Sequence, residues 1–143
     1  WQAPVLFVVE NNHIAQTTPV ELALAGSISA RFAAFNIPAH ELDTSDVMEI
    51  LPAAGALLEQ VRTQSAPRAL ILHTWRFGPH SKGDDTRPAE TIARLRQSRD
   101  PLTLHAARLS PAEEEAIEAQ VEDEIRRAYQ LALADPYPSI ADL

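Results

Sequence analysis

The chain reads Pro4-Val5-Leu6-Phe7-Val8-Val9-Glu10-Asn11-Asn12 near its start, an apolar run that stops abruptly at polar residues. The continuous apolar character and the β-branched residues predict a strand over residues 4–9 that is covered on both faces. A second such run, from Arg68 to Trp75, leads into a loop that contains glycine and proline. The segments between the runs have helical, strand-like and again helical character. The sequence therefore predicts an α/β fold with a parallel sheet and covering helices.

Three elements are expected between the two runs. Residues 27–35 favour a helix that ends before Asn36, a residue that tolerates the left-handed conformation. A short strand over residues 40–42 should follow, and Thr44 or Ser45 can cap the next helix. Pro52 should kink or restart that helix. Its expected apolar stripe comprises Val47, Ile50, Leu51, Ala54, Leu58 and Val61.

The C-terminal part of the chain is expected to be helical. Residues 88–97 predict a short helix, and a long helix should cover about residues 110–134. Ser110 and Glu113 form a capping box around Pro111 at the first helical position. The expected apolar stripe comprises Ile117, Val121, Ile125, Ala128 and Ala132, and the expected ion pairs are Glu122–Arg126 and Asp123–Arg127. We expect residues 1–143 to form a single domain with this helix as a C-terminal extension.

The composition argues against several classes of partner. The formal net charge is −8 and the 12 Lys and Arg residues are scattered, whereas nucleic-acid binding needs them clustered. The absence of cysteine excludes disulfides and cysteine zinc sites. No apolar run approaches the roughly 18 residues that span a bilayer, so we expect no membrane association and a cytoplasmic location. The chain begins at Trp1, almost directly in an expected buried strand, so we expect it to be a fragment.

Polar loops follow both apolar runs, over residues 10–19 and 76–85. The carboxyl ends of parallel strands meet at one edge of a sheet, where open α/β folds bind ligands, so the two loops predict one site. Each loop also has a simpler interpretation. Asn11-Asn12 is an ordinary turn after a strand, and His80 is either an incidental loop histidine or a group suited to proton transfer. The spacing of His40, His73, His80 and His105 fits no compact zinc motif.

The two loops carry a resemblance to a known family. Glu10-Asn11-Asn12 followed by Thr18-Pro19 resembles the end of a thiamine-diphosphate motif, and residues 76–85, Arg-x-Gly-x-His-Ser-x-x-Asp-Asp, resemble a flexible active-site loop. Over nearly its whole length the chain looks like the second half of the alpha subunit of thiamine-diphosphate-dependent 2-oxo acid dehydrogenases, the pyruvate and branched-chain enzymes. The resemblance implies a partial thiamine-diphosphate-binding fold, a parallel sheet with helices on both faces.

The resemblance also implies a magnesium site that holds the cofactor's diphosphate. Asn12 matches the side-chain ligand and Ile14 the backbone carbonyl donor; an amide and a carbonyl oxygen suit Mg²⁺, which prefers oxygen ligands. The family's carboxylate ligand belongs to a Gly-Asp-Gly element, which this chain lacks. The site in this chain is therefore expected to be incomplete, and the glutamate that activates the cofactor is expected on a partner beta subunit.

In the second loop, the resemblance assigns His80 to the diphosphate and to acyl transfer. Ser81 matches a serine that is phosphorylated in mitochondrial relatives, although a plain loop hydroxyl is the favoured interpretation here. Arg76 and Asp84 match residues that order the loop through hydrogen bonds and charge. Many relatives continue to a Tyr-Arg pair, whereas this chain has a shorter segment at residues 85–88.

The function implied by the resemblance is oxidative decarboxylation of a small 2-oxo acid, followed by acyl transfer to a lipoyl group. The expected partners are the beta subunit, in an alpha2beta2 heterotetramer, and a lipoyl-bearing acyltransferase. Pyruvate, branched-chain 2-oxo acids and acetoin all remain possible substrates. The alternative is an assembly module that keeps the fold without the activity. A Gly-Asp-Gly element before Trp1 would favour the enzyme over the module.

Overall fold

The computed structural model describes residues 1–137 and 139. The chain divides into two compact units, Trp1–His105 and Ala106–Leu143, and each is described by itself below. The single domain expected over residues 1–143 stays a prediction.

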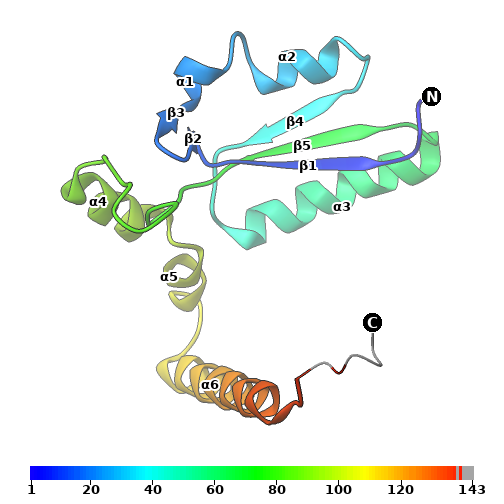
Figure 1. Cartoon of the computed structure of the whole chain (residues 1–143). Helices are drawn as coiled ribbons and strands as arrows, with labels where there is room; N and C mark the ends of the chain where they lie inside the picture. The colour runs from blue at the N-terminus through cyan, green and yellow to red at the C-terminus, as the bar shows by residue number, and fades with distance from the viewer. Residues whose placement is uncertain (138, 140–143) are drawn as a thin grey trace. The chain divides into compact units, whose positions relative to one another are not determined.

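The first unit is built on a three-stranded parallel sheet with the strand order β1-β5-β4, in which β1 is Leu6–Asn11, β4 is Ala39–Leu42 and β5 is Arg68–His73. Helix α2 (Ile28–Ala33) packs on one face of this sheet, and α3 (Val47–Gln64) packs on the other (Figure 1). The predicted α/β class, with a parallel sheet and helices on both faces, is therefore confirmed.

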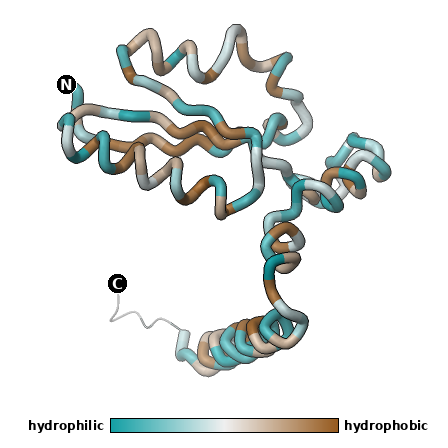
Figure 2. The backbone as a smooth tube through the Cα atoms, turned by 180° about the vertical axis from the view of Figure 1, so that it is seen from behind, coloured by the Kyte–Doolittle hydropathy of each residue, from teal (hydrophilic) through white to brown (hydrophobic). Residues whose placement is uncertain are grey.

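The core of this unit is centred on β5, which has a neighbouring strand on each side. Leu70 and Leu72 pack with Leu57 of α3. Figure 2 shows that the strands of the sheet consist largely of hydrophobic residues. Strand β1 differs from the prediction that it is covered on both faces, because Phe7 is 43% exposed and Val8 is 55% exposed. It lies at the edge of the sheet, and α2 and α3 pack mainly on β4 and β5, so the faces of β1 are covered only in part.

Helix α3 runs without interruption through Pro52, so the predicted restart does not occur. Its core-facing residues are spaced by four, three and four, as a helix requires: Ile50, Ala54, Leu57 and Val61. The predicted stripe was wrong in part, because Val47, Leu51 and Leu58 are 47%, 64% and 40% exposed. The predicted cap was also wrong. Asp46 is the N-cap and accepts from the Met48 N–H at 2.9 Å.

Several short elements complete the first unit. The predicted strand over residues 40–42 is confirmed as part of β4, and Asn36 adopts the predicted left-handed conformation with a φ of 55°. A hairpin that the sequence did not predict joins β2 (Ile14–Ala15) to β3 (Thr18–Pro19) and leads into α1 (Val20–Ala23). The short helix expected at residues 88–97 is α4 (Ala89–Arg99), and α5 (Pro101–Ala106), which was not predicted, follows it.

The second unit contains α6 (Pro111–Ala134), which confirms the predicted long helix. Ser110 caps it in a reciprocal box with Glu113, and the hydrogen bonds from Ser110 hold the pKa of the Glu113 carboxyl below its ordinary value. Arg127 pairs with Asp123 as predicted, whereas Arg126, which was predicted to pair with Glu122, lies 3.8 Å from Asp123. Within the described residues, no helix is both long and apolar enough to cross a membrane.

Candidate functional site

The two polar loops begin side by side at one edge of the sheet. Strands β1 and β5 are parallel neighbours, with Asn11 opposite His73. The Thr74 N–H donates to the Asn11 carbonyl at 2.9 Å, so the pairing continues just past the end of β5. A guanidinium then links the loops, because Arg76 Nη2 donates to the Gln16 carbonyl at 2.9 Å. The prediction that both loops share one rim is confirmed.

Both asparagines of the first loop fold back on the chain that follows them. Asn11 Oδ1 accepts from the His13 N–H and Asn12 Oδ1 accepts from the Ile14 N–H, each at 3.1 Å. Between these two turns, His13 has a φ of 62°, and its carbonyl accepts from the Val20 N–H at 2.9 Å. The turn-forming role of the asparagines is therefore present in the structure.

The same turns leave oxygen atoms suited to a hard cation. The Asn12 amide oxygen has a second lone pair beyond the hydrogen bond that it accepts. Ile14 lies opposite Pro19 in the hairpin, and proline has no amide hydrogen to donate to the Ile14 carbonyl. The hydrogen bond from Ile14 to Asn12 draws these two residues together. Amide and carbonyl oxygens are ligands that Mg²⁺ accepts, so this donor set fits the expected ion.

A cluster of aromatic and titratable side chains that the sequence did not predict lies beside the first loop. His13 Nε2 is 3.2 Å from His73 Nδ1, and the His13 ring stacks on Trp75 with centroids 4.7 Å apart. His73 Nε2 is 3.1 Å from Glu41 Oε2 on β4. No role was predicted for His13, and His73 was predicted only to lie within a strand. The signal available in the sequence was that His13 follows one strand of the sheet and His73 ends the neighbouring one.

Burial and hydrogen bonds set the protonation of this cluster. Burial, with a smaller contribution from the nearby His73, lowers the pKa of His13 below its ordinary value. Hydrogen bonds from Ser29 and then from His73 lower the pKa of Glu41, which is therefore an ionised acceptor at neutral pH. Arg99 of α4 closes the cluster, because its guanidinium pairs with Asp43 and also donates to the His73 carbonyl at 3.1 Å.

In the second loop, Asp84 and Ser81 hold one nitrogen of His80. Asp84 Oδ2 accepts from the Ser81 N–H at 2.9 Å and lies 3.6 Å from His80 Nδ1. The Ser81 hydroxyl is 2.9 Å from the same nitrogen. The His80 side chain is 49% exposed, so its Nε2 is the nitrogen left to meet a ligand.

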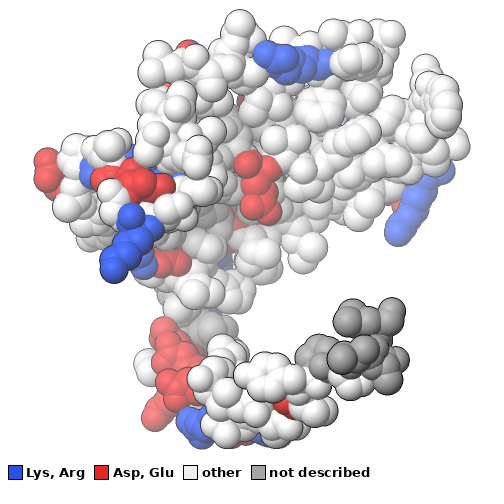
Figure 3. All heavy atoms as spheres, viewed as in Figure 1, with Lys and Arg blue, Asp and Glu red and all other residues white. Residues whose placement is uncertain are grey.

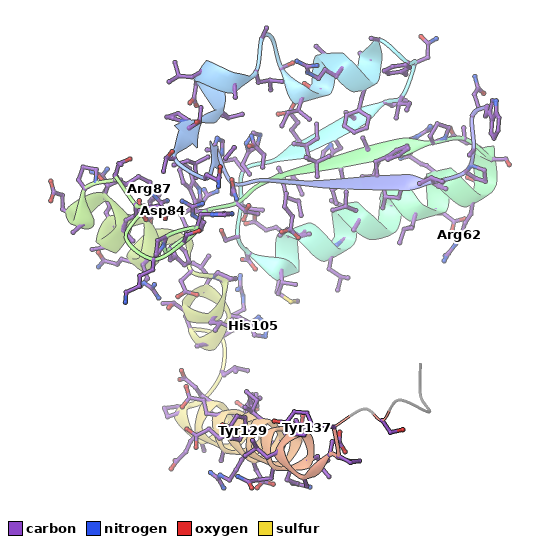
Figure 4. All side chains as sticks on the ribbon, in the orientation of Figure 1. Arg62, Asp84, Arg87, His105, Tyr129 and Tyr137 are labelled. Carbon is purple, nitrogen blue, oxygen red and sulfur yellow. The ribbon has the colours of Figure 1, made fainter. Side chains whose placement is uncertain are left out.

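Arg87 is the residue of this loop that the sequence analysis missed. It donates to the carbonyls of Arg76 at 2.7 Å and Gly78 at 3.1 Å, and it pairs with Asp85 at 2.7 Å. Hydrogen bonds from Arg87 lower the pKa of Asp85 to about 2, and the same pair raises the pKa of Arg87. Figure 4 shows Asp84 and Arg87 at the loop between β5 and α4.

The remaining histidines do not join the site as a metal centre. His40 is exposed on β4, and His105 belongs to α5. Across residues 1–137 and 139, no three His, Cys, Asp or Glu side chains gather so that they could hold a metal ion. The lysine and arginine side chains visible in Figure 3 stand in separate small groups.

Comparisons with known proteins agree on one family. Residues 1–141 match the family described as dehydrogenase E1 component. The chain is 32% identical to the pyruvate dehydrogenase E1 component subunit alpha of Rhizobium meliloti and 32% identical to that of Zymomonas mobilis. It is 31% identical to the human somatic mitochondrial form. In each comparison the whole chain is covered, but it spans only 44%, 43% and 39% of the relative's length.

Proposed function

Because the chain belongs to the dehydrogenase E1 component family, we propose that it is part of the alpha subunit of a thiamine-diphosphate-dependent 2-oxo acid dehydrogenase. The observation that carries this proposal is the meeting of the two loops at one sheet edge, with Arg76 bonded to the Gln16 carbonyl. The pairing brings the oxygen-rich turn at Asn12 and the loop that contains His80 to the same rim.

The first loop would hold the magnesium ion that carries the cofactor's diphosphate. Asn12 would supply its side-chain oxygen and Ile14 its carbonyl, and the missing carboxylate ligand would come from outside this chain. Thiamine diphosphate, when bound, supplies the decarboxylation chemistry. The two turns after β1 would keep these oxygens in place for the ion.

The second loop would bind the diphosphate and move a proton during acyl transfer. The contacts of His80 Nδ1 with Ser81 and Asp84 orient the ring of His80, so that its Nε2 is left for a ligand. We propose a loop-ordering role for Arg76, Ser81 and Asp84, and we add Arg87 to that set. A histidine held in this way by a carboxylate can give or take a proton at its other nitrogen.

The complete protein would work within a larger assembly. We propose a beta subunit as partner, in an alpha2beta2 heterotetramer, and a lipoyl-bearing acyltransferase as acceptor of the acyl group. The relatives carry the name pyruvate dehydrogenase, which favours pyruvate over branched-chain 2-oxo acids or acetoin. We propose a cytoplasmic location, in line with the scattered charges and the lack of a spanning helix among the described residues.

The test is cofactor binding by the complete subunit assembled with its partner. Calorimetry should detect thiamine diphosphate binding that requires magnesium, and the assembly should release carbon dioxide from pyruvate. A folded assembly that binds no cofactor in the presence of magnesium would contradict the proposal and favour the non-catalytic assembly module.

A further inference from the structure

His13 occupies the position between the two proposed magnesium ligands, Asn12 and Ile14. It has a φ of 62°, a left-handed conformation that few residues other than glycine adopt without support. Its backbone is held at both polar groups, because its N–H donates to Asn11 Oδ1 and its carbonyl accepts from Val20. The peptide group between His13 and Ile14 carries the N–H that donates to Asn12 Oδ1, so its orientation also sets where that oxygen lies.

The side chain of His13, like its backbone, has two contacts that fix its position. Its ring stacks on Trp75 at 4.7 Å between centroids, and its Nε2 lies 3.2 Å from His73 Nδ1. The ring therefore ties the first loop to the segment that follows β5. Because the contact is between two histidine nitrogens, it forms only if one carries a hydrogen and the other does not.

Glu41 decides which nitrogen carries the hydrogen. An ionised carboxylate only accepts hydrogen bonds, so the 3.1 Å contact with Glu41 Oε2 needs a hydrogen on His73 Nε2, and the Asn11 amide nitrogen, 3.5 Å from His73 Nδ1, needs an acceptor there. His73 Nδ1 is then an acceptor, and His13 must donate from Nε2. The order Glu41, His73, His13 is that of a carboxylate–histidine pair that orients a group beside a metal ligand.

We propose that His73 and Glu41 are positioning residues for the cation site, acting through His13 to hold Asn12 and Ile14 in the geometry that binds magnesium. This inference rests on the proposed function, because it assumes that the ion binds at this loop. It assigns a role to three side chains from three different segments, after β1, in β4 and at the end of β5.

Two amide substitutions of His73 separate the contact at Nε2, with Glu41, from the contacts at Nδ1, with His13 and Asn11. In His73→Asn the side-chain amide lies near the position of Nδ1, so the variant can still accept from His13 while it loses Glu41. In His73→Gln the amide lies near the position of Nε2, so the variant keeps Glu41 and loses His13. Both variants are neutral and polar, which makes each the control for the other.

The readout is the magnesium concentration that half-saturates thiamine diphosphate binding, measured by calorimetry on the complete assembly. We expect His73→Gln to raise this concentration about 10–100-fold, the usual cost of losing a group that orients a metal ligand. His73→Asn should stay close to the unsubstituted protein, because its amide oxygen accepts from His13 without needing Glu41 to fix a ring tautomer. Cofactor affinity at saturating magnesium should change little in either variant, and thermal unfolding checks that both are folded.

A second variant keeps the inference open to refutation if His73→Gln does not fold. His13→Asn keeps a residue that tolerates a positive φ and removes the ring that meets His73. It should raise the magnesium requirement as His73→Gln does. Equal magnesium requirements in all variants and the parent would overturn the positioning role alone. Failure of the unsubstituted assembly to bind the cofactor would overturn the proposed function, and the inference with it.

Discussion

Replacing Arg87 with alanine removes the hydrogen bonds that close the loop between β5 and α4. Arg87 donates to the carbonyls of Arg76 and Gly78, and its side chain is 16% exposed. Hydrogen bonds from charged donors are worth about 1.5–3 kcal/mol each. Because solvent screens part of each interaction, we expect the two bonds together to contribute about 2 kcal/mol, which is less than two such bonds at the low end of that range. A change of this size makes the open loop about 30-fold more populated.

Trypsin cleavage after Lys82 measures this opening, because Lys82 is exposed and lies in the same loop. When the loop opens and closes faster than it is cut, the cleavage rate follows the population of the open form. We therefore expect the rate at Lys82 to rise about 30-fold in Arg87→Ala. Arg94→Ala is the matched control, since it removes an exposed arginine of α4. Equal cleavage at Lys82 in the two variants would refute the role of Arg87.

Three further outcomes are expected. The Asp85 carboxyl has a pKa of about 2 in the folded protein, below its ordinary 3.8. Its contribution to loop order is therefore complete above pH 3.8 and is lost as the pH falls toward 2. Amide hydrogen exchange in the loop should be faster in Asp85→Asn than in the parent at pH 6, and the two rates should be equal near pH 2. His80→Ala should lower the overall activity of the complex by about 10²–10⁴-fold, and should lower decarboxylation with an artificial electron acceptor by less. Near-normal overall activity would make His80 an incidental loop residue. Leu57→Ala should lower the free energy of unfolding of the first unit by about 2–5 kcal/mol, measured in urea. Leu58→Ala should lower it far less, because Leu58 is 40% exposed. Equal losses of stability would mean that the core is misplaced.

The fold was predictable where the local pattern left one solution. Two apolar runs, each followed by a polar loop, indicate parallel strands with a shared rim, and the structure has them. The stripe of α3 was harder to predict, because Leu57 and Leu58 are adjacent and only the packing on β5 selects Leu57. The exposure of β1 was not predictable, because the sequence of an apolar strand has the same hydrophobic pattern whether the strand lies at the edge of a sheet or in its centre.

The candidate site was predicted in its sequence motifs but not in its cross-chain contacts. The loops around Asn12 and His80 carry their signal in consecutive residues. The contacts of His13 with His73 and of His73 with Glu41 join residues 60 and 32 positions apart. They depend on the register of three strands, which the sequence alone does not fix. The anchor at Arg87 depends likewise on carbonyl groups, which have no sequence signature.

The central claim is that Asn12 binds magnesium rather than only turning the chain. Asn11 is the matched control, because its side chain accepts a backbone hydrogen bond of the same 3.1 Å length one residue earlier. The measurement is a magnesium titration of thiamine diphosphate binding by the complete assembly, with Asn12→Ala and Asn11→Ala compared at matched folding. The account predicts at least about a 10-fold higher magnesium requirement for Asn12→Ala, which loses a ligand, and a smaller rise for Asn11→Ala, which loses only a hydrogen bond that holds His13. The same change in both variants would contradict it.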